Sequence, residues 1–510
     1  MPLLLVCEDN GIGISVPTPP GWIARSYADR ADLRYFAADG ADLPDVLTVS
    51  ARAAEYVRTQ RRPAFLHLRT VRLMGHAGSD YEPGYRSGGE ITADYGRDPL
   101  LGTARTLVES GILSPRQVLD AYEAKRAAVL SLATEVAESA QLASPHAVMK
   151  PLRAALDEAV GASEHAAERG AVARGAAPVT VAQAINGALR DVLREHPEAL
   201  LFGEDVARKG GVYGVTRGLA AAMGPARVFD TLLDEQSILG LALGAGVSGL
   251  LPIPEIQYLA YLHNAADQIR GEGATLQFFS DRQYRNPMVV RIAGYGYQKG
   301  FGGHFHNDNS ITAIRDLPGV VVASPSRPDD AAAMMRACVA AARAAGVVCL
   351  FLEPIALYHT RDLYDDGDEL WLATDHGDAA PIGRVRTYGQ GQDLTILTFG
   401  NGVRMSLRVA RRLAERDIDA RVVDLRWLAP LPVAEMLAES QASGRVLVVD
   451  ETRESGGVSE GVLTALIDHG FTGAMARVAG RDSFIPLGDA ALHVLLSEDT
   501  IEAAAIKLVS

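Results

Sequence analysis

The stretch FDTLLDEQSILGLALGAGVSG, residues 229–249, places two carboxylates directly before a glycine-rich apolar segment. The spacing of its apolar residues predicts a helix from Ile238 to Ser248. Short apolar segments around it predict strands, at 199–202, 288–292 and 320–323. Because apolar strands that alternate with helices form parallel sheets, this part of the chain is predicted to be α/β.

The same pattern extends in both directions. Toward the C-terminus, strands are predicted at 394–398, 420–424 and 445–450, with helices at 403–416 and 456–469. On the N-terminal side of the stretch, a helix is predicted at 179–195, and near the N-terminus a buried parallel strand at 3–6, a helix at 51–60 and a strand at 64–69. Between these parts, an Ala/Glu/Arg-rich region predicts helices followed by a Gly/Ala-rich linker. The expected domains are therefore 1–114, 115–177, 178–375 and 376–510.

Composition excludes several classes of protein. No apolar run is long enough to span a bilayer, and the net charge of −14 comes without a basic patch. Cys7, Cys338 and Cys349 show neither disulfide nor zinc spacing. The chain is thus expected to be soluble and cytoplasmic, with neither a membrane nor a nucleic acid as partner.

A polar turn follows the first predicted strand. Residues 7–15, CEDNGIGIS, place Asn10 where α/β sheets collect ligands. An Asn oxygen and a nearby backbone carbonyl suit Mg²⁺, although a plain turn is the alternative interpretation.

This segment resembles the second half of the thiamine-diphosphate motif in alpha subunits of pyruvate and branched-chain 2-oxo acid dehydrogenases. The resemblance implies Asn10 as a magnesium ligand and Ile12 as a backbone-carbonyl ligand. The family's upstream Gly-Asp-Gly element has no counterpart in this sequence. The alpha part is therefore expected to be cut short at its start.

Residues 72–80, RLMGHAGSD, resemble the mobile active-site loop of the same family. His76 matches the histidine that lies beside the cofactor diphosphate and the substrate, while Met74 stands where the family has an earlier histidine. The alternative is a solvated loop histidine. Imidazole is suited to both phosphate binding and proton transfer.

From Val179 onward the sequence resembles the family's beta subunit, which implies a fused alpha and beta chain. Glu235 matches the glutamate that activates the cofactor by bonding to its pyrimidine ring. Without the resemblance, Glu235 is a helix-terminal carboxylate favoured by the helix dipole, and Asp234 suits the capping position better. The fold implied is a partial diphosphate-binding domain, a pyrimidine-binding domain and a transketolase-type C-terminal α/β domain.

Two further residues follow from the resemblance. Tyr261 matches the family's aromatic residue against the cofactor pyrimidine. Counting back from the Pro318-Gly319 pair selects His306, rather than His304, as the active-site histidine. Glu353, Tyr358 and His359 are assigned no catalytic role.

The resemblance implies oxidative decarboxylation of a 2-oxo acid, with branched-chain acids favoured and pyruvate next. Thiamine diphosphate and Mg²⁺ are the implied cofactors, and the acyl acceptor is the lipoyl group of a dihydrolipoyl acyltransferase. The family also implies a homo-oligomer of at least two chains. The alternatives are a transketolase-like enzyme and an inactive or assembly subunit.

Overall fold

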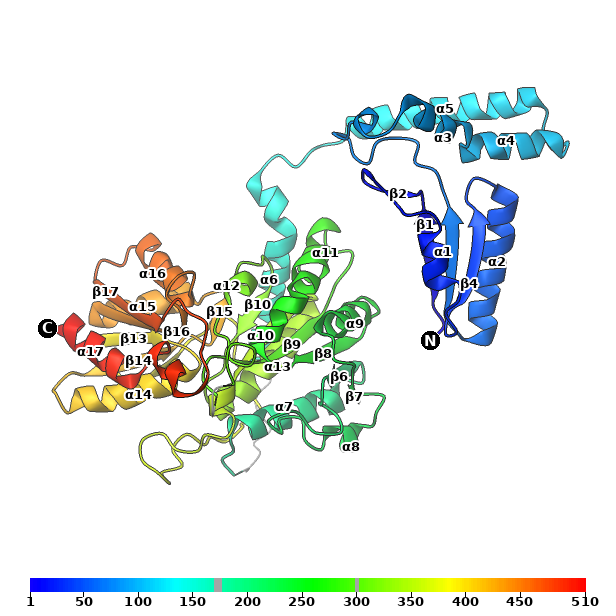
Figure 1. Cartoon of the computed structure of the whole chain (residues 1–510). Helices are drawn as coiled ribbons and strands as arrows, with labels where there is room; N and C mark the ends of the chain where they lie inside the picture. Colours follow the sequence, from blue (N-terminus) through cyan, green and yellow to red (C-terminus); the bar gives the residue numbers. More distant parts are fainter. Residues whose placement is uncertain (169–176, 299–301) are drawn as a thin grey trace. The chain divides into compact units, whose positions relative to one another are not determined.

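The computed structural model describes residues 1–168, 177–298 and 302–510. The chain divides into two compact units, Met1–Gln141 (unit 1) and Leu142–Ser510 (unit 2), and each is described by itself. In Figure 1, unit 1 runs from blue to cyan and unit 2 continues through green and yellow to red. Among the residues described, no helix is long and apolar enough to cross a membrane.

Unit 1 is built on a parallel three-stranded sheet of order β1-β5-β4. The strands are β1 (Leu4–Asp9), β4 (Arg34–Asp39) and β5 (Ala64–Arg69). Helix α2 (Leu43–Gln60) packs on it through Val49, Ala53 and Val57. This helix begins eight residues before the predicted start at 51, because Asp42 accepts a hydrogen bond from the backbone N–H of Asp45 and caps it.

The prediction of a buried first strand is wrong for the structure described. Strand β1 is parallel, as predicted, but it lies at an edge of the sheet and pairs there with β5. Leu5 and Val6 are consequently 40% and 52% exposed. Apolar composition predicted the strand correctly, but the position of a strand within a sheet depends on its neighbours.

The remaining elements of unit 1 are short strands and helices. They are β2 (Ile12–Gly13), β3 (Val16–Pro17), α1 (Trp22–Tyr27), the 3₁₀ turn η1 (Glu82–Gly84), α3 (Gly88–Gly96), α4 (Pro99–Glu109) and α5 (Pro115–Ala137). Strands β2 and β3 form an antiparallel hairpin directly after β1. Ser87 begins α3 through a capping box with Glu90.

The predicted helical region 115–177 is divided between the two units. Helix α5 packs with α4 in unit 1, whereas α6 (Pro145–Glu168) packs on α13 (Pro328–Ala345) in unit 2. Ala155 and Ala159 are buried at the second contact. The linker predicted before Pro178 falls on 169–176, outside the described residues.

Unit 2 begins with a seven-stranded sheet of order β15-β10-β11-β9-β8-β6-β7. Its strands are β6 (Ala199–Gly203), β7 (Val228–Asp230), β8 (Leu251–Ile256), β9 (Met288–Gly294), β10 (Val321–Ala323), β11 (Val348–Pro354) and β15 (Trp427–Ala429). All neighbours pair in parallel except β10 and β15. The predicted parallel sheet is confirmed.

Helices cover this sheet and supply the turns at its carboxyl edge. They are α7 (Val181–Glu195), α8 (Leu219–Met223), α9 (Glu235–Val247), α10 (Leu259–Leu262), η2 (His263–Ala265), the π-helical turn η3 (Gln268–Gly273), α11 (Thr275–Phe279), α12 (Thr312–Arg315), α13 and η4 (Ile355–Leu357). Helix α7 starts two residues after the predicted 179, since Thr180 and Gln183 form a capping box. Figure 1 shows the helices of this part in green, with cyan α6 beside α11.

A buried charged group lies in the middle of this sheet. The guanidinium of Arg291 (β9) bonds to Glu353 (β11) at 2.7 Å and to Glu255 (β8) at 2.5 Å. The Tyr358 hydroxyl donates to Glu353 at 2.6 Å. Because a buried charge is costly without partners, this network satisfies Glu353 and Tyr358 inside the fold.

The C-terminal part of unit 2 forms a five-stranded sheet of order β12-β14-β13-β16-β17. Its elements are β12 (Arg386–Tyr388), β13 (Leu394–Thr398), α14 (Asn401–Ala414), β14 (Ala420–Asp424), α15 (Val433–Ser443), β16 (Arg445–Arg453), α16 (Val458–Asp468), β17 (Ala474–Gly480), η5 (Gly488–His493) and α17 (Glu498–Val509). Strand β15 leaves this part and joins the edge of the seven-stranded sheet.

Candidate active site

Glu235 is the first residue of α9, and its side chain is buried with 6% exposure. Its Oε2 accepts a hydrogen bond of 3.0 Å from the side-chain amide of Asn264 in η2. Asp234 occupies the N-cap position, and its carboxylate accepts a hydrogen bond from the Ser237 hydroxyl. A purely capping carboxylate would be solvated, so burial and a side-chain partner distinguish Glu235 from Asp234.

A second carboxylate, which the sequence reasoning assigned no role, lies near Glu235. Glu204 follows β6 and is 8% exposed. Burial, together with the negative charges of Glu235, Asp205 and Glu255, raises the pKa of Glu204 to about 7. Its Oε1 is buried and makes no hydrogen bond to any described residue. In the sequence, the position of Glu204 directly after a predicted buried strand could have indicated a site residue.

An aromatic cluster lies beside these carboxylates. The ring of His306 lies 5.1 Å from that of Tyr258 and 6.0 Å from that of Tyr261, between centroids, and both contacts are edge-on. Burial raises the pKa of Tyr261, with further contributions from Tyr258 and from the carboxylates Glu204 and Glu235. The Nδ1 atom of His306 is buried and has no partner within the described part of the chain.

The structure distinguishes the two histidines of the 302–310 segment. His306 faces Tyr258 and Tyr261, whereas the His304 ring packs 4.1 Å from Phe305 and 5.5 Å from Phe484. Of the two, His306 is therefore the histidine that contacts the aromatic cluster.

Asp308 holds the segment that carries His306. Its carboxylate bonds to His263 Nε2 at 2.9 Å, to the Ser310 hydroxyl at 2.6 Å and to the Arg453 guanidinium at 2.9 Å. Burial acts to raise the pKa of Asp308, but hydrogen bonds from His263 and Ser310 and the charge of Arg453 outweigh it, so the pKa lies below its ordinary value. The segment is thus fixed to both η2 and β16.

In unit 1, two side chains accept hydrogen bonds from the backbone of the turn after β1. Asp9 Oδ1 accepts from Gly11 N at 2.9 Å, and Asn10 Oδ1 accepts from Ile12 N at 3.1 Å. Gly11 and Ile14 have positive φ values of 76° and 55°. Asn10 and Ile12 therefore share one tight turn. The described residues contain no group of three or more His, Cys, Asp or Glu side chains able to hold a metal ion.

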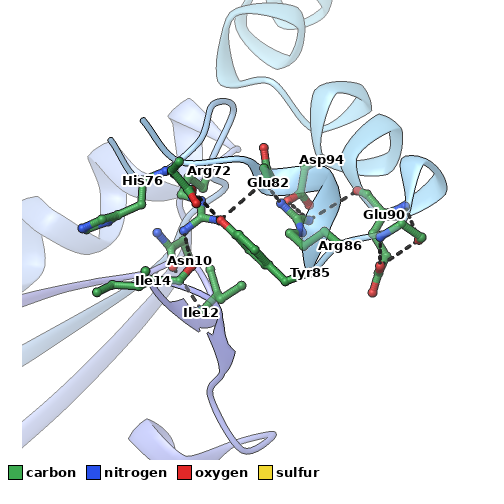
Figure 2. Close-up of polar contacts among 12 residues, drawn as sticks. Asn10, Ile12, Ile14, Arg72, His76, Glu82, Tyr85, Arg86, Glu90 and Asp94 are labelled. Carbon is green, nitrogen blue, oxygen red and sulfur yellow. Dashed lines mark hydrogen bonds and ion pairs between the residues drawn. The ribbon is translucent and has the colours of Figure 1, made fainter. Parts of the chain in front are cut away.

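The loop that carries His76 is folded around one carboxylate. Asp80 Oδ2 accepts from the backbone N–H of His76 at 2.7 Å and from the Tyr85 hydroxyl at 2.6 Å. These bonds, the one from Tyr85 being the strongest influence, hold the pKa of Asp80 below its usual range. The exposed imidazole of His76 extends away from Arg72 and Tyr85 (Figure 2).

Arg72 connects this loop to the turn after β1. Its guanidinium donates to the backbone carbonyl of Ile14 at 2.7 Å and to the Tyr85 hydroxyl at 2.6 Å. On the other side of Tyr85, Arg86 bonds to Glu82 at 2.7 Å and to Asp94 at 2.6 Å (Figure 2). Arg72 also lies 3.5 Å from Glu82, so one connected polar network spans the turn, the loop and α3.

The structure places the site residues predicted from sequence in two groups. Glu235, Tyr261 and His306 lie in unit 2 around the aromatic cluster, while Asn10, Ile12 and His76 lie in unit 1. Sequence reasoning missed Glu204, Asn264, Tyr258 and Asp308 in unit 2 and the Arg72–Asp80–Tyr85 network in unit 1. Asn264 and Asp308 bond to residues 29 to 145 positions away, whereas the contacts of Asp80 are four and five positions away.

Three family models match successive parts of the chain. Residues 1–146 match "Dehydrogenase E1 component", 177–358 match "Transketolase, pyrimidine binding domain" and 383–501 match "Transketolase, C-terminal domain". The pyruvate dehydrogenase E1 component subunit beta of Bacillus subtilis (strain 168) is 33% identical over 322 residues, which cover 62% of this chain and 93% of that protein. The chain belongs to the thiamine-diphosphate-dependent 2-oxo acid dehydrogenase E1 family.

Further comparisons agree with this family. The corresponding beta subunits of Staphylococcus epidermidis (strain ATCC 12228 / FDA PCI 1200) and Staphylococcus aureus (strain MW2) are 32% and 33% identical, with the same 62% and 93% coverage. A solved structure described as "Split gene transketolase, inactive beta4 tetramer" matches with a TM-score of 0.52 and 20% identity, over 65% of this chain and 99% of that one. At that identity the match shows the fold alone, and the predicted transketolase-type pyrimidine-binding and C-terminal domains are confirmed.

Proposed function

We propose that this E1-family chain catalyses the oxidative decarboxylation of a 2-oxo acid and transfers the acyl group to the lipoyl group of a dihydrolipoyl acyltransferase. The observation that carries the proposal is the buried carboxylate of Glu235, oriented by Asn264 beside the Tyr258–Tyr261–His306 cluster. A buried carboxyl group of this kind is suited to hold a proton at a ring nitrogen.

The residues of unit 2 fit the pyrimidine end of thiamine diphosphate. His306 Nδ1 and Glu204 Oε1 are buried polar atoms without partners in the described chain, and the half-buried ring of Tyr261 lies 6.0 Å from that of His306. Buried polar atoms without partners are rare in native proteins and favour a missing ligand. When bound, thiamine diphosphate supplies the electron sink that accepts the electrons released as carbon dioxide leaves.

The proposed roles follow from the position of each side chain. Glu235 hydrogen-bonds the pyrimidine nitrogen and holds the proton there, while Tyr261 packs against the ring face. His306, held by the Asp308 network, exchanges a proton with the substrate oxygen. Glu204, with a pKa of about 7, changes the charge beside Glu235 around neutral pH.

In unit 1, the residues fit the diphosphate end of the cofactor. Asn10 Oδ1 and the carbonyl of Ile12 are neutral oxygens on one turn, which suits Mg²⁺ bound largely through phosphate oxygens. His76 would contact the diphosphate from the loop that Asp80 folds. Two protein oxygens do not make a metal site by themselves, so the metal is proposed to bind together with the diphosphate.

An apolar substrate is supported by the segment before α9. Leu232 and Leu233 are 87% and 79% exposed, three and two positions before Glu235. Exposed leucines adjacent to a buried catalytic carboxylate are suited to an aliphatic substrate side chain. We therefore propose branched-chain 2-oxo acids such as 3-methyl-2-oxobutanoate, with pyruvate next, and an oligomer of at least two chains.

Turnover by the purified full chain with thiamine diphosphate and Mg²⁺ tests the proposal. 3-Methyl-2-oxobutanoate, pyruvate and a ketose phosphate are compared, with an artificial electron acceptor for the two 2-oxo acids and carbon transfer to an aldose phosphate for the sugar. We expect the 2-oxo acids to be substrates and Glu235→Gln to reduce kcat by about 100-fold or more. The matched control is Glu272→Gln, an exposed glutamate outside the site.

Each other result selects an alternative. Turnover of the ketose phosphate in place of 2-oxo acids would identify a transketolase-like enzyme. Cofactor binding without turnover of any of the substrates would favour an assembly subunit. Equal activity of the Glu235→Gln and Glu272→Gln variants would refute the role of Glu235.

A further inference from the structure

A polar cavity lies in unit 2, among residues that are not part of the candidate active site. It encloses about 590 Å³ and is lined by the first turns of α7, the turn 213–217 and the segment 359–361. Three of its lining side chains are basic, namely Arg217, His359 and Arg361. None of the described residues that line it is acidic, although the chain carries a net charge of −14.

The arginines of this cavity differ in their partners. Arg361 pairs with Glu369 at 2.5 Å. Arg217 forms no ion pair with any described residue, and its guanidinium is folded back over the turn, since a Cβ added at Gly214 would lie 3.1 Å from its Nη2. A guanidinium with free donors at a cavity is suited to a planar or tetrahedral anion.

Another cavity of unit 2 also contains arginines, but there their charge is balanced by carboxylates. That cavity, of about 630 Å³, also contains two arginines, Arg285 and Arg343. There, Arg343 pairs with Glu198 at 2.9 Å, and Arg285 lies 3.7 Å from Glu158. Its positive charge is therefore neutralised by carboxylates of the same chain, whereas that of Arg217 is not.

The turn that carries Arg217 is held from both sides. The side-chain amide of Asn186 donates to the carbonyls of Val215 at 2.7 Å and Arg217 at 3.1 Å. The Nε2 atom of His359 donates to the carbonyl of Tyr213 at 2.9 Å and so holds the turn from its other side. The cavity is thus built on a fixed frame.

We propose that this cavity binds a small anion with a phosphoryl or carboxylate group, with Arg217 as its principal contact and Arg361 as a further donor. Such an anion would lie beside Tyr213, whose hydroxyl is 3.3 Å from that of Tyr258 in the aromatic cluster. The cavity is therefore one residue away from the cluster that contains His306. The proposal does not rest on the proposed function, because it concerns other residues and needs no turnover.

Calorimetric titration of the full chain tests the site. Sodium phosphate and sodium acetate are titrated separately at constant ionic strength, without thiamine diphosphate, so that the two anion chemistries are distinguished. We expect saturable binding of at least one anion, weakened by about tenfold or more in Arg217→Gln. Arg208→Gln is the matched control, since Arg208 is exposed on the same segment but does not line the cavity.

Arg217→Lys retains the charge and is expected to bind more tightly than Arg217→Gln. Circular dichroism checks the fold of each variant, and Arg361→Gln replaces Arg217→Gln if the latter does not fold. The proposal is overturned if neither anion binds saturably, or if the cavity variant binds both anions as tightly as Arg208→Gln does.

Discussion

Asn264 donates a hydrogen bond of 3.0 Å from its side-chain amide to Oε2 of Glu235, joining η2 to the first residue of α9. The two residues are 29 positions apart in sequence. Because Glu235 is buried, the direction in which its carboxylate points depends on this partner. Asn264 is therefore a positioning residue for the proposed catalytic glutamate.

Replacement of Asn264 by alanine is expected to lower kcat/KM by about tenfold, less than the loss in Glu235→Gln. The physical reason is that one oxygen of a buried carboxylate loses its donor, which costs about 1–3 kcal/mol, and tenfold corresponds to about 1.4 kcal/mol. Steady-state kinetics with the preferred 2-oxo acid measure the effect, and thermal melting shows whether the variant is folded. A kcat/KM equal to that of the unchanged protein would contradict the positioning role.

Glu204→Gln is expected to flatten the pH profile of kcat/KM near neutrality. The pKa of Glu204 is raised to about 7, so its negative charge next to Glu235 appears as the pH rises through that value. Gln has the same shape but does not ionise. The measurement is kcat/KM from pH 5.5 to 8.5, with the exposed Glu272→Gln as a control. If the pH profile of kcat/KM in Glu204→Gln still bends near pH 7, another group titrates there.

Unit 2 is expected to lose stability as the pH rises toward 8, in part through Glu451. Burial raises the pKa of Glu451 to about 8 despite hydrogen bonds from Asn401. Because the folded pKa lies above the unfolded one, the folded protein holds a proton that the unfolded chain has lost between about pH 4.5 and 8. This stabilisation is complete at pH values below the unfolded pKa, and it is lost as the pH rises through the folded pKa.

In Glu451→Gln this contribution is absent, so the free energy of unfolding should fall less steeply between pH 5 and 8. The difference in slope should amount to about 1 kcal/mol or more over the range, since one pKa unit corresponds to about 1.4 kcal/mol. Urea unfolding at each pH measures it. Equal slopes for both proteins would contradict the raised pKa.

Asp80→Asn is expected to loosen the His76 loop without unfolding unit 1. The carboxylate accepts from both His76 N and the Tyr85 hydroxyl, whereas an amide oxygen is a weaker acceptor. Limited proteolysis should cut residues 73–84 faster, with little change in melting temperature.

His76→Ala should instead reduce turnover and leave both the proteolysis rate and the melting temperature nearly unchanged. Loss of stability with full specific activity in His76→Ala would refute its catalytic role.

Calorimetric titration with thiamine diphosphate and Mg²⁺ tests the turn after β1. We expect Asn10→Ala to weaken Mg²⁺-dependent cofactor binding by about tenfold, because it removes one of two proposed oxygen contacts. Asn10 Oδ1 also accepts from Ile12 N, so Asn10→Asp, which keeps that acceptor, serves as the comparison. Equal affinity of the Asn10→Ala and unchanged proteins would remove Asn10 from the proposed site.

Much of the local structure followed from sequence alone. Strands β5, β13 and β14 have the bounds that their apolar runs predict. A buried strand is rich in apolar side chains, and the run ends where the strand meets a turn. Helix starts were less accurate, because Asp42 and Thr180 fix them through capping bonds rather than through apolar spacing.

The sequence by itself determined the alternation of strands and helices, the family and the residue types at Glu235, Tyr261 and His306, since these depend on periodicity and on short motifs. Tertiary structure alone decided that β1 is an edge strand, that α6 packs on α13, that Asn264 bonds to Glu235, and that Glu204 lies close enough to Glu235 for its pKa to rise. The physical reason is that burial, charge proximity and hydrogen bonding join residues far apart in the chain, and local sequence carries no record of those distances.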